Sequence, residues 1–196
     1  MGTLKTTNIQ SISGSGTVTL GTSGETFTVP SGVTVNMSSA TQTGVGGANT
    51  PAFEAYLASD QGLSDATWAK LTINTEILDT NGTYDHSTNY RWTPAQTGKY
   101  IIFAKCKLNA GDAYLRDNQI SIYKNGSSYV TSSNYGNNSD EDIWGNHSIT
   151  FMENVTSTSD YYELWGYMNI VGGSPVASGG SSPYVTYFGA YKLIGV

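Results

Sequence analysis

Short runs in which apolar and polar residues alternate, separated by glycine-rich turns, recur along the whole chain. Alternation with a period of two, rich in β-branched and aromatic residues, is typical of strands with one buried face. The segment Leu63–Lys70 is the exception and is predicted to form one short turn of helix. An all-β fold is therefore expected, a sandwich or jelly roll. Its nine predicted strands are Ala52–Ala58, Lys70–Leu78, Tyr90–Trp92, Gly98–Leu108, Asn118–Lys124, Ser127–Ser133, Ile143–Met152, Tyr161–Ile170 and Val185–Ile194.

Turn-forming dipeptides stand between most of these strands. Asn125-Gly126, between ISIYK and SSYVT, supplies the two residues with positive φ that a two-residue hairpin turn needs. The stretch GGSPVASGGSSP at residues 172–183 has no large side chain to specify a conformation, and it is expected to be a mobile loop.

Residues 1–50 differ in composition from the rest. They hold short alternating stretches such as TVTL, TFTV and VTVNM, which are too few to bury a core within one chain. Two interpretations stay open: a loose linker, or a β-rich stalk that packs against copies of itself. Gly-rich residues 41–51 form the expected hinge. The predicted domains are a short-strand stalk or attachment segment, residues 1–50, and a jelly-roll head, residues 51–196.

Composition and charge exclude several classes of protein. Of the 196 residues, 12% are charged, and the net charge of −6 leaves no basic face for nucleic acid or an anionic membrane. No apolar run is long enough to span a bilayer. The N-terminus lacks the apolar stretch of a signal peptide, so export by the usual route is not expected. The single cysteine, Cys106, leaves no partner for an intramolecular disulfide or a Cys-based zinc site.

Several blocks of residues, in order along 52–196, share one pattern of aromatic and turn residues. They are Phe53; Asn81, Tyr84, Asp85, Trp92, Pro94, Gly98, Tyr100 and Phe103; Ile122, Lys124, Asn125 and Gly126; and Phe188, Gly189, Tyr191 and Leu193. At these positions the chain resembles the trimeric jelly-roll heads of the complement type and the tumour-necrosis-factor-like domains. It departs from them in having Tyr90-Arg91-Trp92 where Gly and Phe are common, and in lacking a collagen Gly-X-Y stalk.

A head of this kind on a Thr/Ser/Gly-rich segment looks like small fibre or appendage proteins of tailed bacteriophages. The resemblance implies a homotrimer and a non-enzymatic virion protein, a tail fibre, spike or head appendage. Such a protein joins other virion proteins through its N-terminal segment and presents its head to a host surface, glycan or protein. The alternatives are a capsid or tail decoration protein without a ligand, and a secreted signalling head. The lack of a signal peptide argues against the last.

The final strand carries more large rings than one face of a strand in a small monomer needs. Aromatic residues are enriched in interfaces because they bury much area at a low entropy cost. The alternative is an ordinary monomeric core. The residues predicted to form the trimer interface are Phe53, Tyr184, Tyr187, Phe188 and Tyr191.

The polar segment 131–147 is the strongest candidate for ligand binding, because long loops on a rigid sandwich commonly carry recognition. A ring beside amide and carboxylate groups suits a sugar, whose C–H face packs on the ring. The alternatives are an ordinary solvated connection and a calcium site at residues 140–142, which lacks the usual ligand spacing. We predict no metal and no cofactor. The predicted ligand-binding residues are Tyr135, Asn137, Asn138, Asp140, Asp142 and Trp144.

No catalytic motif is present, so no enzyme activity and no catalytic residue are predicted. Carboxylate pairs such as Glu153 and Asp160 are too common to indicate glycoside hydrolysis. His147 is expected in a loop, Cys106 as a buried inert thiol, and Tyr84-Asp85 in a structural role.

Overall fold

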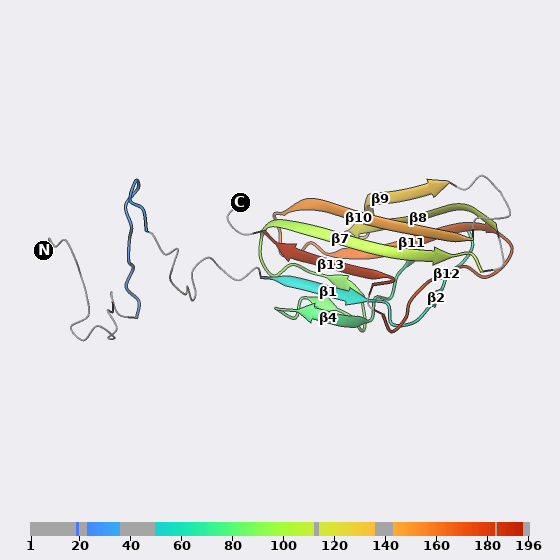
Figure 1. Ribbon diagram of the computed structural model, residues 1–196, viewed down its shortest axis with the longest axis horizontal. Coiled ribbons are helices and arrows are strands. Elements are labelled where there is room, and N and C mark those ends of the chain that lie inside the picture. Colours follow the sequence, from blue (N-terminus) through green and yellow to red (C-terminus); the bar gives the residue numbers. More distant parts are fainter. Residues whose placement is uncertain are drawn as a thin grey trace, which may run out of the picture. The chain divides into compact units, whose positions relative to one another are not determined.

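The structure is a computed structural model that describes Thr19 and residues 23–35, 50–111, 114–135, 143–182 and 184–193. The chain divides into two units, Met1–Thr43 and Gly44–Val196. Within the described part of the second unit, the regular elements are all strands, paired antiparallel in two sheets. Figure 1 shows these strands running along the length of the unit.

The larger sheet is built around one long strand, β7 (Gly98–Asn109). Strand β10 (Trp144–Val155) pairs with the whole of one edge of β7. On the other edge, β13 (Tyr187–Lys192) pairs with the first half of β7 and β12 (Val176–Ala177) with its end. The sheet is completed by β1 (Ala52–Tyr56), β4 (Thr75–Asp79) and β2 (Gln61–Gly62).

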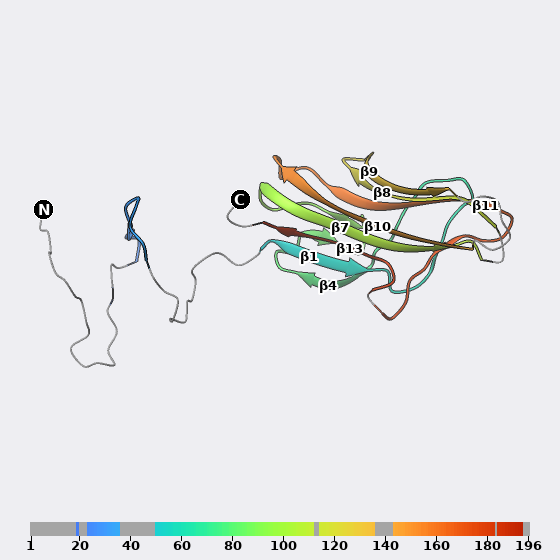
Figure 2. The ribbon, with the colours of Figure 1, turned by 45° about the horizontal axis from the view of Figure 1, so that its top comes forward.

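The smaller sheet has β11 (Tyr162–Val171) between β8 (Tyr114–Lys124) on one edge and two short strands on the other. In Figure 2, β8 and β9 lie above β7. The remaining strands of this sheet are β9 (Ser127–Tyr135), β3 (Ala69–Lys70), β5 (Tyr84–Asp85) and β6 (Arg91–Trp92).

A cluster of aromatic rings fills the core between the sheets. Phe53 stacks on Tyr84 with ring centroids 4.9 Å apart and meets Phe188 edge-on at 5.1 Å. Trp92 lies 5.1 Å from Tyr100, 5.4 Å from Tyr162 and 5.3 Å from Phe53. These rings come from both sheets, so they join the two layers.

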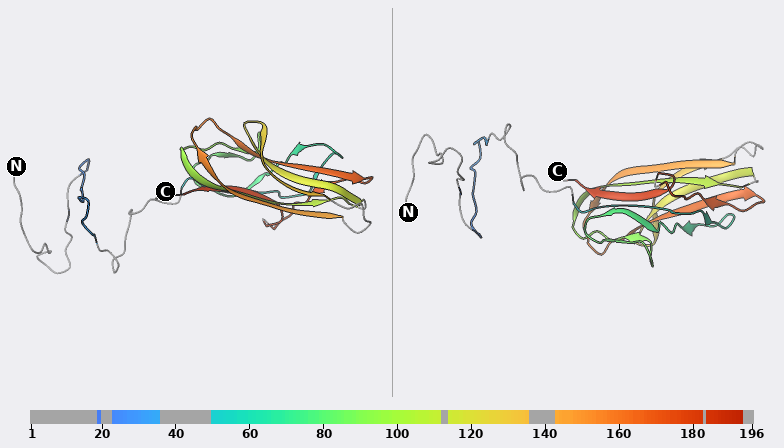
Figure 3. Two further views of the ribbon diagram at one scale, coloured as in Figure 1. Left: turned by 90° about the horizontal axis from the view of Figure 1, so that it is seen from above. Right: turned by 60° about the horizontal axis from the view of Figure 1, so that its bottom comes forward.

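The two ends of the head differ in what they carry. Strand β1 begins where β13 ends, because Ala52 pairs with Tyr191 (Figure 3). The connections β7–β8, β9–β10 and β11–β12 leave their strands at the opposite end, as the pairing of Asn109 with Trp144 and with Val176 shows. We call this opposite end the distal end.

The structure corrects the prediction for Leu63–Lys70, which is not helical. The backbone N–H of Ala66 donates to Met168 O, and the Asp65 carboxylate accepts the N–H of Ile170. These bonds fasten the segment to β11, and Ala66 has a φ of 50°, outside the right-handed helical region. The predicted strand Lys70–Leu78 is correspondingly two strands, β3 and β4.

The predicted hairpin at Asn125-Gly126 is confirmed. Both residues have positive φ, 52° and 78°, and Lys124 pairs with Ser127 across the turn. Strand β8 begins at Tyr114, four residues before the predicted start.

In the N-terminal unit, residues 23–35 contain two turns and no assigned strand. Phe27, Val33 and Val35 are exposed in the single chain. The predicted stalk requires copies of the chain and stays a prediction, and most of residues 1–50 lie outside the described ranges.

Candidate functional site

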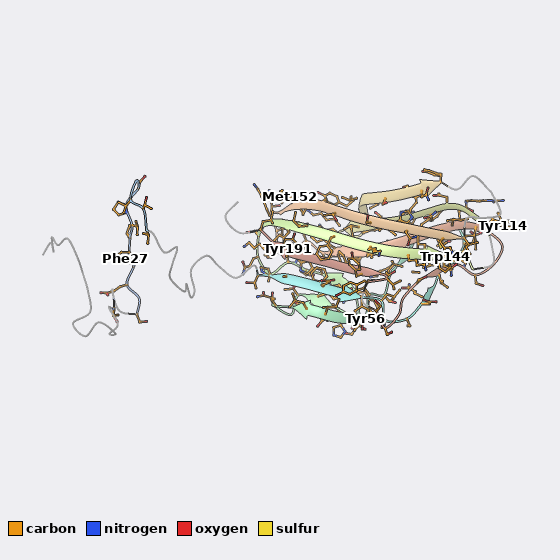
Figure 4. All side chains as sticks on the ribbon, in the orientation of Figure 1. Phe27, Tyr56, Tyr114, Trp144, Met152 and Tyr191 are labelled. Carbon is orange, nitrogen blue, oxygen red and sulfur yellow. The ribbon has the colours of Figure 1, made fainter. Side chains whose placement is uncertain are left out.

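The outer face of the larger sheet carries a patch of half-buried apolar side chains: Ile101, Phe103, Tyr187 and Tyr191. We call it the larger-sheet patch. Strand alternation turns these side chains away from the core. The Phe103 ring centroid lies 6.1 Å from that of Tyr187 and 6.2 Å from that of Tyr191. Figure 4 shows Tyr191 on this sheet, with Met152 toward the same end of the unit.

Gly189 shapes the larger-sheet patch. A Cβ at this position would lie 2.4 Å from Cζ of Phe103 and 2.9 Å from the backbone oxygen of Phe53. Only glycine therefore lets the Phe103 ring lie against β13, between Tyr187 and Tyr191.

Two of the predicted interface residues are reassigned. Phe53 and Phe188 are 1% and 0% exposed within the single chain, so they have no surface left to give to an interface. Both side chains point into the aromatic core. In β13, strand alternation places Phe188 on the core side of the sheet and its neighbour Tyr187 on the outer side. Tyr184 is exposed, and its backbone oxygen accepts a hydrogen bond from Lys105 Nζ at 3.2 Å.

Tyr135 and Trp144, two of the predicted ligand-binding residues, end β9 and begin β10 at the distal end. Trp144 lies on the outer face of the larger sheet, with Lys107 Nζ 3.7 Å from its ring centroid. Tyr135 lies on the outer face of the smaller sheet, so the two rings do not share one site. Outside the described residues lie the other predicted ligand-binding residues, Asn137, Asn138, Asp140 and Asp142. The alternative calcium site, residues 140–142, also lies outside them.

The prediction that His147 lies in a loop is wrong. His147 lies in β10, where it pairs with Cys106 and is 4% exposed. Its ring points between the sheets, because Nδ1 is 3.1 Å from Ser132 Oγ and Nε2 contacts Asn118 Oδ1. Burial lowers the pKa of His147, although the Asp117 carboxylate partly opposes this effect.

This lowered pKa predicts a loss of stability in mild acid. The unfolded chain takes up the histidine proton first as the pH falls, because its pKa keeps the ordinary value of 6.5. The stability contributed by neutral His147 is therefore complete above about pH 6.5 and is lost below it, toward the folded-state pKa. Urea unfolding between pH 7.5 and 5 measures this loss. His147→Gln, which does not titrate, should have a smaller pH dependence, and an unchanged dependence would contradict the assignment.

Cys106 is fully buried, and burial raises the pKa of its thiol to about 12 against an opposing hydrogen bond from Thr186. We expect no reaction with a thiol reagent such as Ellman's reagent in the native protein and stoichiometric reaction in denaturant. Ser148→Cys places a second thiol on the exposed side of β10 and is the control that should react natively. Equal rates for the two thiols in the folded protein would show that Cys106 is accessible.

A polar network surrounds the buried carboxylate of Glu153. Its carboxylate accepts hydrogen bonds from Lys124 Nζ at 2.8 Å, Tyr129 Oη at 2.9 Å and Tyr162 Oη at 3.0 Å. Burial by itself lowers the pKa of Lys124, but its bonds to Glu153, Tyr162 and Asp160 hold it above its ordinary value. Each of these side chains is hydrogen-bonded to another member of the network. The network therefore joins the two sheets and offers no free acid or base.

Tyr84 and Asp85 have the structural role that was predicted. The Tyr84 hydroxyl donates to Ile73 O at 2.8 Å. The N–H of Thr88 and the Asn89 amide hydrogen-bond the Asp85 carboxylate and, against the opposing effect of burial, lower its pKa to about 2. Asp85 therefore orders the turn between β5 and β6.

The described ranges lack two further kinds of site. They contain no helix of the length and apolarity that crossing a membrane requires. They also contain no group of three His, Cys, Asp or Glu side chains placed to hold a metal ion.

The structure reveals one surface that the sequence analysis missed, on the outer face of the smaller sheet. Four half-buried rings lie there: Trp68, Tyr123, Trp165 and Tyr167. The available signal was the alternation W-G-Y-M-N at residues 165–169, which puts Trp165, Tyr167 and Asn169 on one face.

Comparison with known proteins agrees with the fold described above. No protein-family model matches the chain, and no curated protein sequence matches it. The structure is similar to that of Eiger TNF from S. frugiperda, with a TM-score of 0.51 and 12% identity over 72% of this chain and 91% of that one. A structure of murine APRIL at pH 8.0 gives a TM-score of 0.48 and 11% identity over 72% and 98% of the two chains. The similarity to Eiger TNF confirms the predicted all-β jelly roll.

Proposed function

We propose that the chain is a non-enzymatic structural protein of a tailed-bacteriophage virion, a tail fibre, spike or head appendage. In this proposal its head forms a homotrimer and attaches the particle to a host surface or glycan. The observation that carries the proposal is the larger-sheet patch, since soluble monomers rarely leave a contiguous apolar face uncovered. Aromatic residues are also enriched at the centres of protein interfaces.

The resemblance to trimeric jelly-roll heads supports three copies as the occupants of this patch. Tyr187, Tyr191 and the exposed Tyr184 are the predicted interface residues that keep accessible surface in the single chain. Phe103 and Ile101 join them on the same sheet face.

The ends of the head suit attachment. The chain enters β1 at the end opposite to the β7–β8, β9–β10 and β11–β12 connections. A head joined to other virion proteins through residues 1–50 presents its distal end and outer faces to the surroundings. Three heads in each trimer, and several trimers on a particle, convert weak contacts into stable attachment through avidity.

A binding role, rather than catalysis, fits the surroundings of three charged groups of the head. Glu153, Lys124 and Asp85 are each occupied by several hydrogen bonds within the head. None of the three is poised toward a substrate.

The proposal is tested on purified particles of the phage whose genome encodes the chain, with antibodies raised against the purified chain. We expect gold-labelled antibody to mark projections on the virion and to reduce adsorption to the host. Labelling without any effect on adsorption would instead support the decoration protein. Absence of the chain from purified particles would overturn the virion assignment.

A further inference from the structure

The outer face of the smaller sheet has a regular arrangement of polar and aromatic side chains. Strand pairing places Trp165 beside Ser121, Tyr167 beside Gln119 and Asn169 beside Asp117. On the next strand, Thr131, Ser133 and Tyr135 continue these three rows. The rows cross three strands, so the face is about 10 Å wide from β11 to β9.

Aromatic rings form one side of this face. Trp68 reaches over the sheet, with its ring centroid 5.3 Å from that of Tyr167 and 6.0 Å from that of Tyr123. Tyr123 stacks on Trp165 at 4.5 Å and 15°. Trp165 Nε1 donates to the Glu163 carboxylate at 3.0 Å, which fixes the orientation of the indole. The rings are therefore a rigid surface rather than a set of mobile side chains.

The polar groups are also held in place. Gln119 Nε2 donates to Asp117 Oδ2 at 3.0 Å, and Ser133 Oγ donates to Gln119 Oε1 at 3.0 Å. Three neighbouring polar groups on this face have no hydrogen-bond partner among the described residues: Trp68 Nε1, the Tyr135 hydroxyl and the Asn169 amide. A fixed amide and carboxylate next to unpaired donors and acceptors is suited to a ligand with several hydroxyl groups.

The charge of the face limits the ligand further. Lys70 is paired with Glu163 at 2.9 Å, so its positive charge is neutralised within the head. Asp117 has no cationic partner among the described residues. The face thus repels an acidic ligand and complements an uncharged one.

From this geometry we infer that the outer face of β8, β9 and β11 binds an uncharged carbohydrate. The carbohydrate packs the C–H faces of its sugar rings on Tyr135 and on the rings of Trp68 and Tyr167, while Asp117 and Gln119 hydrogen-bond its hydroxyl groups. The inference rests on the proposed attachment function, whose ligand class it names. It relocates the predicted site from the whole segment 131–147 to the face on which Tyr135 lies.

The test uses the full chain on an array of printed neutral and acidic glycans, followed by titration of the neutral glycan that binds best. Tyr135→Ala and Gln119→Ala alter the proposed face. Trp144→Ala is the matched control, because it removes an exposed ring from the start of β10, in the other sheet. We expect binding to neutral glycans that each of the first two variants weakens at least tenfold and that the control leaves unchanged.

Several outcomes would overturn the inference: no binding to any neutral glycan, a preference for acidic glycans, or equal weakening by Trp144→Ala. These outcomes are separable from failure of the proposed function. A chain that binds neutral glycans through this face but is absent from virions would overturn the proposed function alone. The inference alone would be overturned if the antibody labels virions and blocks adsorption but the chain binds no glycan.

Discussion

A chain in which Trp92 is replaced by alanine is expected to lose about 3–5 kcal/mol of unfolding free energy. Trp92 is 1% exposed and lies within 5.4 Å, centroid to centroid, of Phe53, Tyr100 and Tyr162. Its Nε1 also donates to Thr83 Oγ1 at 3.2 Å. Alanine leaves a cavity between the two sheets, where the rings of both layers meet and little can collapse to fill it.

Denaturant unfolding followed by circular dichroism measures this loss. All variants are compared at one protein concentration, because association of chains makes apparent stability depend on concentration. Trp144→Ala is the control, since Trp144 is 44% exposed and the substitution removes a surface contact with Lys107 Nζ, 3.7 Å from its ring centroid, rather than a core contact. That variant should lose about 1 kcal/mol or less. Equal losses for the two variants would contradict the central place of Trp92 in the core.

The long strands were predictable because their signal is local. The alternation along β7, β10 and β11 can be seen in any short window, and Asn125-Gly126 identifies its own turn. Strands β2, β5 and β12 were missed because each has two residues and exists only through a distant partner. Gln61, for example, pairs with Ala177.

The candidate surfaces were predictable only in part. Alternation separates Phe188 from Tyr187 and Tyr191, but does not say which side of β13 faces the core. The partner Phe53, far away in the sequence, decides it by stacking with Tyr84 and meeting Phe188. Trp68 is the opposite case: it lies outside any strand, and only the path of its segment along the edge of β11 brings its ring to Tyr123 and Tyr167.

The two outer faces of the head differ in chemistry, and this difference predicts which of them a trimer buries. The larger-sheet patch presents rings and an aliphatic side chain. The face of β8, β9 and β11 combines its rings with a hydrogen-bonded row of Asp117, Gln119 and Ser133. Burying Asp117, Gln119 and Ser133 against an apolar surface of another copy would remove their polar groups from water without new partners, which is costly. Trimer contacts are therefore expected on the larger sheet, which leaves the smaller sheet free for a ligand.

Tyr191→Arg is accordingly expected to convert the full chain from a trimer to a monomer. Tyr191 is half-buried beside Phe103 on the outer face, so the substitution spares the core. In a trimer, however, it brings three arginines into one apolar interface. Like charges placed together in an interface cost several kcal/mol, and each guanidinium also loses water.

Light scattering on the purified chain decides this prediction. The unmodified protein should have the mass of three chains of 20.9 kDa, and Tyr191→Arg the mass of one, with an unchanged circular dichroism spectrum. Tyr135→Arg adds the same charge to the outer face of the smaller sheet and should remain trimeric. If Tyr191→Arg stays trimeric while Tyr135→Arg dissociates, the assignment of the two faces is reversed. If both stay trimeric, residues 1–50 hold the chains together and the larger-sheet patch has another occupant.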